Sequence, residues 1–428
     1  MATVLALTVP AEASEADLFV HLRGFCAGVQ GIAAEEYLAR QESLRPLLSQ
    51  HQLSAALFEA GSDLQYFTGV RWSRSERPFL FVLLANGSSL YVAPDFEAAR
   101  ANQSLLWADG VALATWQEDE DPYLPADAFV ASYCAALASC PLLLGHDTRV
   151  FIATGLQNSW QLASDAPSNH DNASSPAVLQ LEDEPEVVAS LRRVKSAAEM
   201  AILRCASEAT KASLAAVQPL IREGMSESEL KGLLFSAQTS AGLSDLWALV
   251  LFGANAALPH GTADKLKLQS SMGVLLDTGG SLLGYQSDVS RTIYPLTHDI
   301  PPQELLAWNT VRSAQLAALQ AISQRQANAT CGDIDAAARS VVAEAGFGSD
   351  YQFFTHRLGH GIGLDGHEEP YLVRANPLPL QPGFVFSVEP GLYNLTAYGV
   401  RLEDIVAVIA EPPGYEVLGA LQDSPFSV

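Results

Sequence analysis

The first half of the chain alternates between helix-like and strand-like patterns of apolar residues. Residues 30–50 carry apolar side chains at roughly helical spacing, which predicts an amphipathic helix. The run SAALFEA that follows predicts a strand. Two further apolar runs flank Asn86 and Gly87, a pair that predicts a β-hairpin because it supplies the positive φ angles of a type I′ turn. The alternation extends to about residue 165 and indicates an α/β domain.

The second half begins with a polar, turn-rich segment, residues 166–176, which is the predicted linker. A long helical pattern runs from Leu191 to Val217, and a second helix is predicted near 226–241. Apolar strand runs separated by glycine-containing turns follow. We therefore expect two domains, residues 1–180 and residues 185–428.

Two pairs of these strand runs carry acidic residues. The runs VLLD and YQSDVSR flank TGGSLLG, a hairpin-like arrangement that would bring Asp277 and Asp288 side by side. The runs QPGFVFSVEPGLY and YGVRLEDIVAVI predict a second antiparallel pair, which carries Glu389 and Glu403. Neighbouring carboxylates repel each other strongly unless a cation lies between them.

Composition narrows the class of protein. The chain of 428 residues is 49% hydrophobic and can bury a sizeable core. It has no apolar run of 18 residues, so we expect no membrane span. The N-terminus lacks the basic region of a secretory signal. The formal net charge of -24 argues against nucleic acids and anionic membranes as partners.

The cysteines and the Asn-x-Ser/Thr triplets are interpreted in view of the missing secretory signal. The five cysteines are odd in number and form no CxxC pair, so free thiols in a reducing compartment are expected. Several Asn-x-Ser/Thr triplets occur, and we interpret them as chance. The predicted location is the cytoplasm.

Candidate metal ligands are concentrated in the last third of the chain. Two metal ions held close together need carboxylates that bridge both ions, terminal carboxylates and a histidine nitrogen. Residues of these types occur in apolar or glycine-rich surroundings, where an unpaired carboxylate is costly. The five candidates are Asp277, Asp288, His360, Glu389 and Glu403.

Other residues near these candidates suggest a substrate site. His356, His360 and His367 lie within twelve residues around a glycine-rich loop, which favours a site over three separate structural histidines. Arg401 lies two residues before Glu403, so on a strand both side chains point to the same face. Its guanidinium could bind a substrate carboxylate or orient an acidic ligand.

These ordered motifs resemble the catalytic domain of the "pita-bread" metallopeptidases: prolidase (Xaa-Pro dipeptidase), aminopeptidase P and methionine aminopeptidase. The resemblance covers roughly residues 185–428. The upstream half is similar to the N-terminal domain of prolidase and aminopeptidase P, which methionine aminopeptidases lack. The resemblance implies an α/β (α+β) protein, with a C-terminal pita-bread fold built on a curved antiparallel sheet and an N-terminal α/β domain.

The resemblance also implies a cofactor and residue roles. It implies two divalent metal ions per subunit, Mn²⁺ in the first place and Co²⁺ or Zn²⁺ as alternatives. Glu389 would take a proton from the attacking water and pass it to the proline nitrogen. His260, seventeen residues before Asp277, and His367 would stabilise the developing oxyanion. His356 would line the substrate cleft.

The expected activity is hydrolysis of Xaa-Pro peptide bonds by a homodimer, with a dipeptidase preferred. The alternatives are an aminopeptidase P acting on longer peptides with proline in second position and a hydrolase similar to organophosphorus acid anhydrolase. A metal-free creatinase-like enzyme or a non-enzymatic binding module is disfavoured, because all five ligand positions are occupied.

One position departs from the family pattern. Relatives of this type usually carry a tyrosine five residues after the first aspartate ligand, where this chain has Leu282. The resemblance implies that the missing hydroxyl belongs to the proton or amine network near the metals. We therefore expect an effect on rate and metal preference rather than on the type of reaction.

Overall fold

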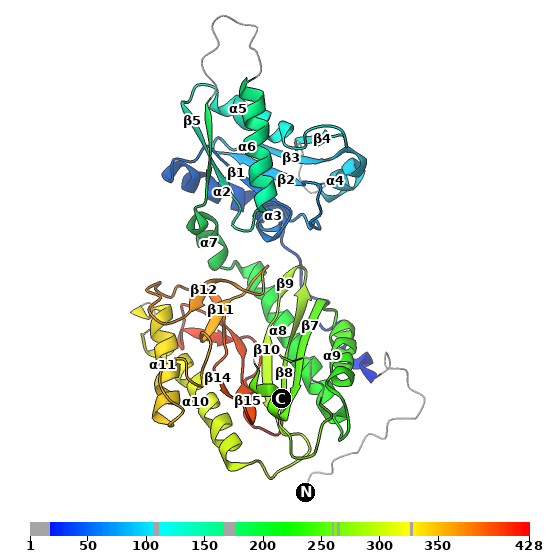
Figure 1. The fold of residues 1–428 in the computed structure, drawn as a ribbon, viewed down its shortest axis with the longest axis vertical. Coiled ribbons are helices and arrows are strands. Elements are labelled where there is room, and N and C mark those ends of the chain that lie inside the picture. The colour runs from blue at the N-terminus through cyan, green and yellow to red at the C-terminus, as the bar shows by residue number, and fades with distance from the viewer. Residues whose placement is uncertain (1–17, 106–110, 166–176, 259–260, 263–265, 326–327) are drawn as a thin grey trace, which may run out of the picture. The chain divides into compact units, whose positions relative to one another are not determined.

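A computed structural model of the protein describes residues 18–105, 111–165, 177–258, 261–262, 266–325 and 328–428. Within these residues the chain forms two compact units (Figure 1). The N-terminal unit is Ile32–Arg192, and the C-terminal unit combines residues 18–31 with Arg193–Val428.

The division between the units differs in two ways from the expected 1–180 and 185–428. Residues 18–31 belong to the C-terminal unit, because Phe19 and Leu22 are buried in its hydrophobic core. The predicted linker 166–176 lies outside the described residues. The helix before it and the strand after it both belong to the N-terminal unit, so the chain passes between the units at residues 31–32 and 192–193 instead.

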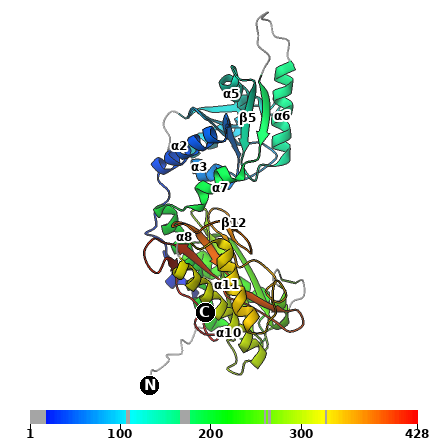
Figure 2. The ribbon, with the colours of Figure 1, turned by 90° about the vertical axis from the view of Figure 1, so that its left-hand side faces the viewer.

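The N-terminal unit is a six-stranded mixed sheet with helices on both faces (Figure 2). The strand order is β4-β3-β2-β1-β5-β6. The strands are β1 (Ala55–Glu59), β2 (Leu80–Leu84), β3 (Ser89–Pro94), β4 (Leu113–Trp116), β5 (Ser139–Leu144) and β6 (Val178–Glu182). The helices are α2 (Ala34–Gln50), α3 (Ser62–Thr68), α4 (Ala98–Ser104), α5 (Leu124–Cys134), α6 (Val150–Asp165) and α7 (Pro185–Arg193).

Strand β1 is buried along its whole length because helices cover both faces of the sheet. Ala55 and Leu57 pack in the core formed with α5 and α6. Phe58 points to the other face, where its ring stacks on Phe67 of α3 at a centroid distance of 4.8 Å. The continuous apolar run predicted as a strand is therefore a central strand, as such runs usually are.

The hairpin predicted at Asn86 and Gly87 is confirmed, but its turn is of another type. Strands β2 and β3 pair in antiparallel register, with Leu84 and Ser88 closing the loop. Gly87 has a φ of 95°, whereas Asn86 is not among the residues with positive φ. This is a three-residue loop that ends in a left-handed glycine, which replaces the expected type I′ turn.

The C-terminal unit contains antiparallel sheets with helix pairs packed on the outside (Figures 1 and 2). The strands of the first sheet are β7 (Ser244–Phe252), β8 (Val274–Leu282), β9 (Tyr285–Gln286) and β10 (Val289–Ile293). The others are β11 (Gly359–Gly361), β12 (Glu368–Leu372), β13 (Val385–Val388), β14 (Gly391–Asn394), β15 (Tyr398–Arg401), β16 (Asp404–Val408) and β17 (Tyr415–Val417). The helices are α8 (Ala197–Val217), α9 (Glu227–Ala241), α10 (Pro302–Arg325) and α11 (Cys331–Glu344).

Helix starts in this unit are set by capping boxes. Ser196 and Glu199 cap α8 reciprocally, and Ser226 with Glu229 does the same for α9. The helix predicted to run unbroken from Leu191 is therefore wrong at its start. Helix α7 ends at Arg193, and the capping box at Ser196 begins a new helix.

The expected fold class is confirmed: a mixed α/β N-terminal unit precedes a C-terminal unit of antiparallel sheets and paired helices. None of the helices in the described ranges is both long and apolar enough to span a bilayer.

The cysteine interpretation is wrong for four of the five residues. Cys26 pairs with Cys205, and Cys134 pairs with Cys140, which leaves Cys331 as a buried free thiol. The pairing between Cys26 and Cys205 spans 179 positions, so spacing in the sequence gave no sign of it. Disulfides persist mainly in oxidising compartments, so the cysteines no longer support a cytoplasmic location.

Thiol titration tests this pairing. Protein denatured without reductant should show one reactive thiol per chain, that of Cys331, and five after complete reduction. A titre of five before reduction, with alkylation of Cys26 and Cys205 in intact protein, would restore the original interpretation.

A second prediction concerns Asp127, a buried acid on α5. Burial raises the pKa of its carboxyl to about 7, from an ordinary 3.8. The unfolded chain therefore loses this proton near pH 4, whereas the folded unit retains it up to about pH 7. Stability is consequently lost as the pH rises through this window. Asp127→Asn should raise the melting temperature at pH 8 by roughly 4 °C or more, and much less at pH 4.

The matched control is Asp119→Asn, which removes the same charge from an exposed position. Differential scanning calorimetry at the two pH values makes the comparison. An Asp127→Asn gain that is equal at both pH values would show that burial of an ionised group is not the cause.

Candidate metal centre

Asp277 and Asp288 come from the hairpin formed by β8, β9 and β10, as predicted. Its two-residue turn is Leu283 and Gly284, whose φ angles of 53° and 95° are both positive. In the antiparallel register Asp277 lies opposite Ser290, and Asp288 directly precedes β10. The hairpin therefore brings the two aspartates to one place in the first sheet.

Glu389 and Glu403 come from a second antiparallel pair, β13 and β16. Val388 is paired with Asp404, so Glu389 and Glu403 occupy the next positions at the end of this ladder. The backbone N–H of Glu403 donates to the carbonyl of Ser290 at 3.0 Å. This bond connects the second pair of acids to the strand that follows Asp288.

His360 lies at the centre of β11, between β12 and β13. The glycine before it is required: a Cβ at Gly359 would lie 1.9 Å from the carbonyl oxygen of Ser387. The Nδ1 atom of His360 lies 3.1 Å from the carbonyl oxygen of Gly361 and is the donor to it. The Nε2 lone pair is then available as a metal ligand.

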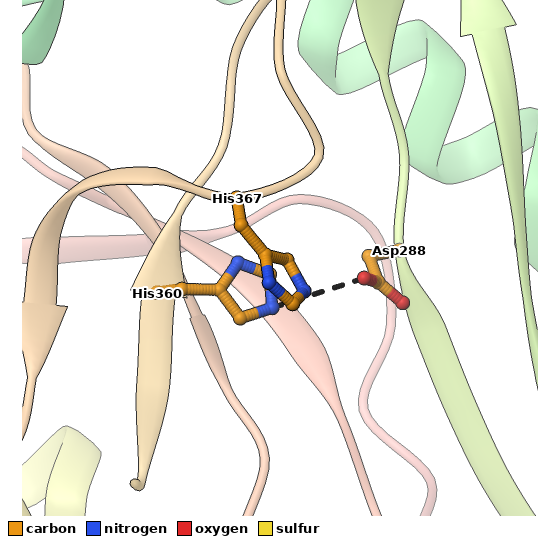
Figure 3. A group of neighbouring side chains, drawn as sticks. All are labelled: Asp288, His360 and His367. Carbon is orange, nitrogen blue, oxygen red and sulfur yellow. Dashed lines mark ion pairs between the residues drawn. The ribbon is translucent and has the colours of Figure 1, made fainter. Parts of the chain in front are cut away.

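The structure brings all five predicted ligands together. The Nε2 atom of His360 lies 3.2 Å from Glu389, 3.8 Å from Asp288 and 4.0 Å from Glu403. Figure 3 shows His360 directed at Asp288, with His367 beside it. Within the five predicted ligands, two triads have ligand atoms within 4.8 Å of one another: His360, Glu389 and Glu403 form one, and Asp277, Asp288 and Glu403 form the other. Glu403 belongs to both.

Two carboxylate oxygens in this group are buried without a hydrogen-bond partner in the described part of the chain: Oδ1 of Asp288 and Oε1 of Glu403. Burial, followed by the charges of the neighbouring acids, raises the pKa of both groups well above their ordinary values. A buried anion is costly unless it is paired or bound to a metal. The oxygen-rich set with one imidazole therefore fits divalent cations.

All three side-chain nitrogens of Arg401 donate hydrogen bonds next to these acids. Its side chain is buried and donates from Nη2 to Asp277 at 2.5 Å, from Nε to Ser290 at 2.8 Å and from Nη1 to Tyr393 at 2.9 Å. The Tyr393 hydroxyl in turn lies 2.8 Å from Nε2 of His356. Of the two roles predicted for Arg401, these contacts favour orienting an acidic ligand over binding a substrate carboxylate.

The five residues border a cavity of about 650 Å³. Its other walls carry apolar, cationic and imidazole groups, contributed by Trp247, Leu249, Thr355, Arg357 and His367. His367 is exposed, and its ring lies 3.8 Å from that of His360. Partial desolvation of its ring, followed by the effect of the nearby His360, lowers the pKa of His367 to about 4, which leaves the imidazole neutral near pH 7.

Comparison with known proteins decides the family. The sequence pattern of metallopeptidase family M24 matches residues 201–410, and that of the creatinase/prolidase N-terminal domain matches residues 40–153. Over 389 residues the chain is 35% identical to an uncharacterised peptidase of Schizosaccharomyces pombe, a span of 88% of this chain and 80% of that protein. The chain belongs to metallopeptidase family M24.

Solved structures within M24 share the whole fold. The dipeptidase PepE from Mycobacterium ulcerans aligns with a TM-score of 0.78 at 30% identity, over 92% of this chain and 98% of that one. A prolidase from Thermococcus sibiricus aligns with a TM-score of 0.78 at 25% identity, over 90% of this chain and 97% of that one. This confirms the resemblance that the sequence motifs indicated.

Of two further positions singled out in the sequence, one is not among the described residues and the other does not line the cavity. His260 is outside the described residues. Leu282 ends β8 and packs, half-buried, against the hydrophobic core of the C-terminal unit. The hydroxyl of Tyr285, the nearby aromatic residue, donates to Glu199 of α8 at 3.0 Å. Leu282 thus has a packing role in this M24 chain.

Sequence reasoning missed Ser290 and Tyr393. The Ser290 hydroxyl lies 2.9 Å from Oδ1 of Asp277 and 3.0 Å from Oε2 of Glu403, and its single proton can be donated to either. Ser290 follows Asp288 by two residues on a strand, and this spacing could have identified it. Tyr393 had no comparable signal, because its contact with Arg401 depends on the pairing of β14 with β15.

Ser290→Ala should weaken divalent metal binding by roughly 10-fold or more, because loss of a hydrogen bond to metal-ligating carboxylates typically costs 10- to 100-fold. Competition with a fluorescent chelator measures the affinity without any need for turnover. Ser281→Ala is the matched control, since its hydroxyl is buried without a partner among the described residues. Equal affinities for the two variants would show that Ser290 does not hold the carboxylates in place.

Proposed function

We propose that this M24 chain is a metal-dependent Xaa-Pro dipeptidase that uses two divalent ions, with Mn²⁺ as the preferred metal. The observation that carries the proposal is the overlap of the two ligand triads at Glu403, which is the arrangement a bridging carboxylate requires. The named dipeptidase and prolidase relatives support the substrate class.

When bound, such ions acidify a water molecule and polarise the scissile carbonyl. The chain itself supplies the proton path. Glu389 is one of the less buried of the four acids. The Ser387 hydroxyl donates a hydrogen bond to Oε1 of Glu389 and holds this oxygen in place. We assign Glu389 the transfer of the water proton to the proline nitrogen. His367 is exposed and lines the cavity, and we assign it and His260 the donation of hydrogen bonds to the developing oxyanion.

His356 and Arg401 orient the site in this proposal. The chain of contacts from His356 through Tyr393 to Arg401 ends on Asp277. Burial lowers the pKa of His356, whose side chain lines the cavity. The homodimer and the cytoplasmic location remain predictions from the sequence, and the thiol titration bears on the second.

The test is hydrolysis of Ala-Pro with added Mn²⁺, compared with Ala-Ala and Ala-Pro-Ala. We expect Ala-Pro to be cleaved fastest, activity to disappear on chelation, and activity to return when Mn²⁺ is restored. Glu389→Gln should lower kcat by roughly 10²- to 10⁴-fold, because the amide keeps the shape but accepts no proton.

Glu411→Gln is the matched control at an exposed site. Undiminished hydrolysis in the presence of chelator would rule out the metal-dependent reaction. Preference for Ala-Pro-Ala over Ala-Pro would move the assignment to an aminopeptidase P, and preference for Ala-Ala would remove the proline specificity.

A further inference from the structure

Half of the asparagines in the chain stand in the pattern of an N-glycosylation acceptor. Five of the ten lie two positions before a serine or threonine, with no proline between. Serine and threonine make up 54 of the 428 residues, so a random arrangement would give roughly one such triplet among ten asparagines. The five acceptors are Asn86, Asn102, Asn172, Asn328 and Asn394. The triplets are therefore more frequent than chance predicts.

The cysteines give an independent indication of the compartment. The interpretation of the triplets as chance depended on a cytoplasmic location. Two disulfides, Cys26–Cys205 and Cys134–Cys140, join four of the five cysteines. Disulfides persist mainly in oxidising compartments such as the ER lumen and in secreted proteins. Asparagine triplets act as glycan acceptors in secreted proteins, so one compartment accounts for both features.

Four of the acceptors lie in the described part of the chain, and each of them reaches the surface. A glycan is bulky, so only an asparagine that reaches solvent can carry one in the folded protein. Asn394 is half-buried, and the other three are exposed: Asn86, Asn102 and Asn328. Asn172 lies outside the described residues. The fold is thus compatible with a glycan at every acceptor that it describes.

Asn86 and Asn394 lie at hairpin turns, and their side-chain oxygens are held within the triplet. Oδ1 of Asn86 accepts a hydrogen bond from the backbone N–H of Ser88 at 2.9 Å. Oδ1 of Asn394 accepts from the hydroxyl of Thr396 at 2.9 Å and from its backbone N–H at 3.3 Å. In both turns the Nδ2 nitrogen, the atom that would carry the glycan, donates to no described residue.

Asn394 is next to a residue of the metal centre in the sequence, but it points to the other face of its strand. The hydroxyl of Tyr393 contacts Arg401 and His356. Successive side chains of a strand alternate between its faces, so Asn394 points away from these groups. A glycan there would lie beside Leu395, which is 71% exposed at the same turn, and would leave the cavity open.

We propose that Asn86 and Asn394 are N-glycosylation sites and that the chain matures in an oxidising compartment. In the transfer, Nδ2 of the asparagine forms a bond to the anomeric carbon of a lipid-linked glycosyl diphosphate. The bond from that carbon to the diphosphate oxygen breaks, the amide nitrogen loses one proton, and the lipid diphosphate leaves. Such modification is independent of peptidase activity and excludes the cytoplasmic location predicted from the sequence.

The sites are mapped in the chain purified from its native organism. Peptide-N-glycosidase in heavy-oxygen water converts each glycan-bearing asparagine to aspartate and introduces one heavy oxygen, which mass spectrometry locates. We expect the label at Asn86 and Asn394, together with a downward shift in intact mass. Incubation without the enzyme is the control, because asparagine followed by glycine, as at Asn86, also deamidates on its own.

Recovery of both triplets without glycan and without enzyme-dependent label would overturn the proposal. Label at one position alone would retain that site and remove the other.

Full-length variants produced in the same organism test the acceptor pattern at Asn86. Asn86→Gln and Ser88→Ala should each remove one glycan and increase electrophoretic mobility, whereas Ser88→Thr should retain the glycan because it keeps the hydroxyl. Asn309→Gln is the matched control, since Asn309 is exposed but belongs to no triplet. Equal mobility of the parent and all four variants would overturn the assignment of Asn86.

Discussion

Four carboxylates, those of Asp277, Asp288, Glu389 and Glu403, converge in the C-terminal unit with little access to water. At such distances and in such burial their mutual repulsion opposes folding, and each strand that carries one must be held against it. The antiparallel ladders β8–β10 and β13–β16 supply that restraint, because both end at the acids. The compensating charges come from Arg401 on one side and from the proposed cations on the other.

A second layer of charge lies directly behind the acids. Asp404, next to Glu403 in the chain, is fully buried between Arg291 at 2.8 Å and Lys211 at 2.6 Å. Burial alone would raise the pKa of Asp404, but these two cations hold it below its ordinary value. Arg291 also donates to the carbonyl of Glu403 at 2.7 Å. The ligand position of Glu403 is thus attached to helix α8 and strand β10 through an ion-pair network.

The sequence was most informative where local pattern and chemistry coincide. Asp277 and Asp288 could be placed on one hairpin because apolar runs flank a glycine-rich turn, and period-two spacing linked Arg401 to Glu403. The sequence was least informative where contacts depend on three-dimensional proximity alone. Nothing in the spacing of Cys26 and Cys205 indicates that they meet, and the partners of Arg401 follow from strand pairing between distant segments. The broken helix near Ser196 is an intermediate case, because its capping box is visible in the sequence although the helical pattern of apolar residues continues across it.

The disulfide bond between Cys26 and Cys205 changes the covalent connection between the two units. Both cysteines lie in the C-terminal unit, and the whole of Ile32–Arg192 lies between them in the chain. The N-terminal unit is therefore part of a closed covalent ring and is not attached by the backbone alone. One break in the backbone anywhere within that ring leaves a single molecule, and only a second break or reduction of the bond can release a fragment. The chain thus keeps its N-terminal unit through any single proteolytic event in the ring.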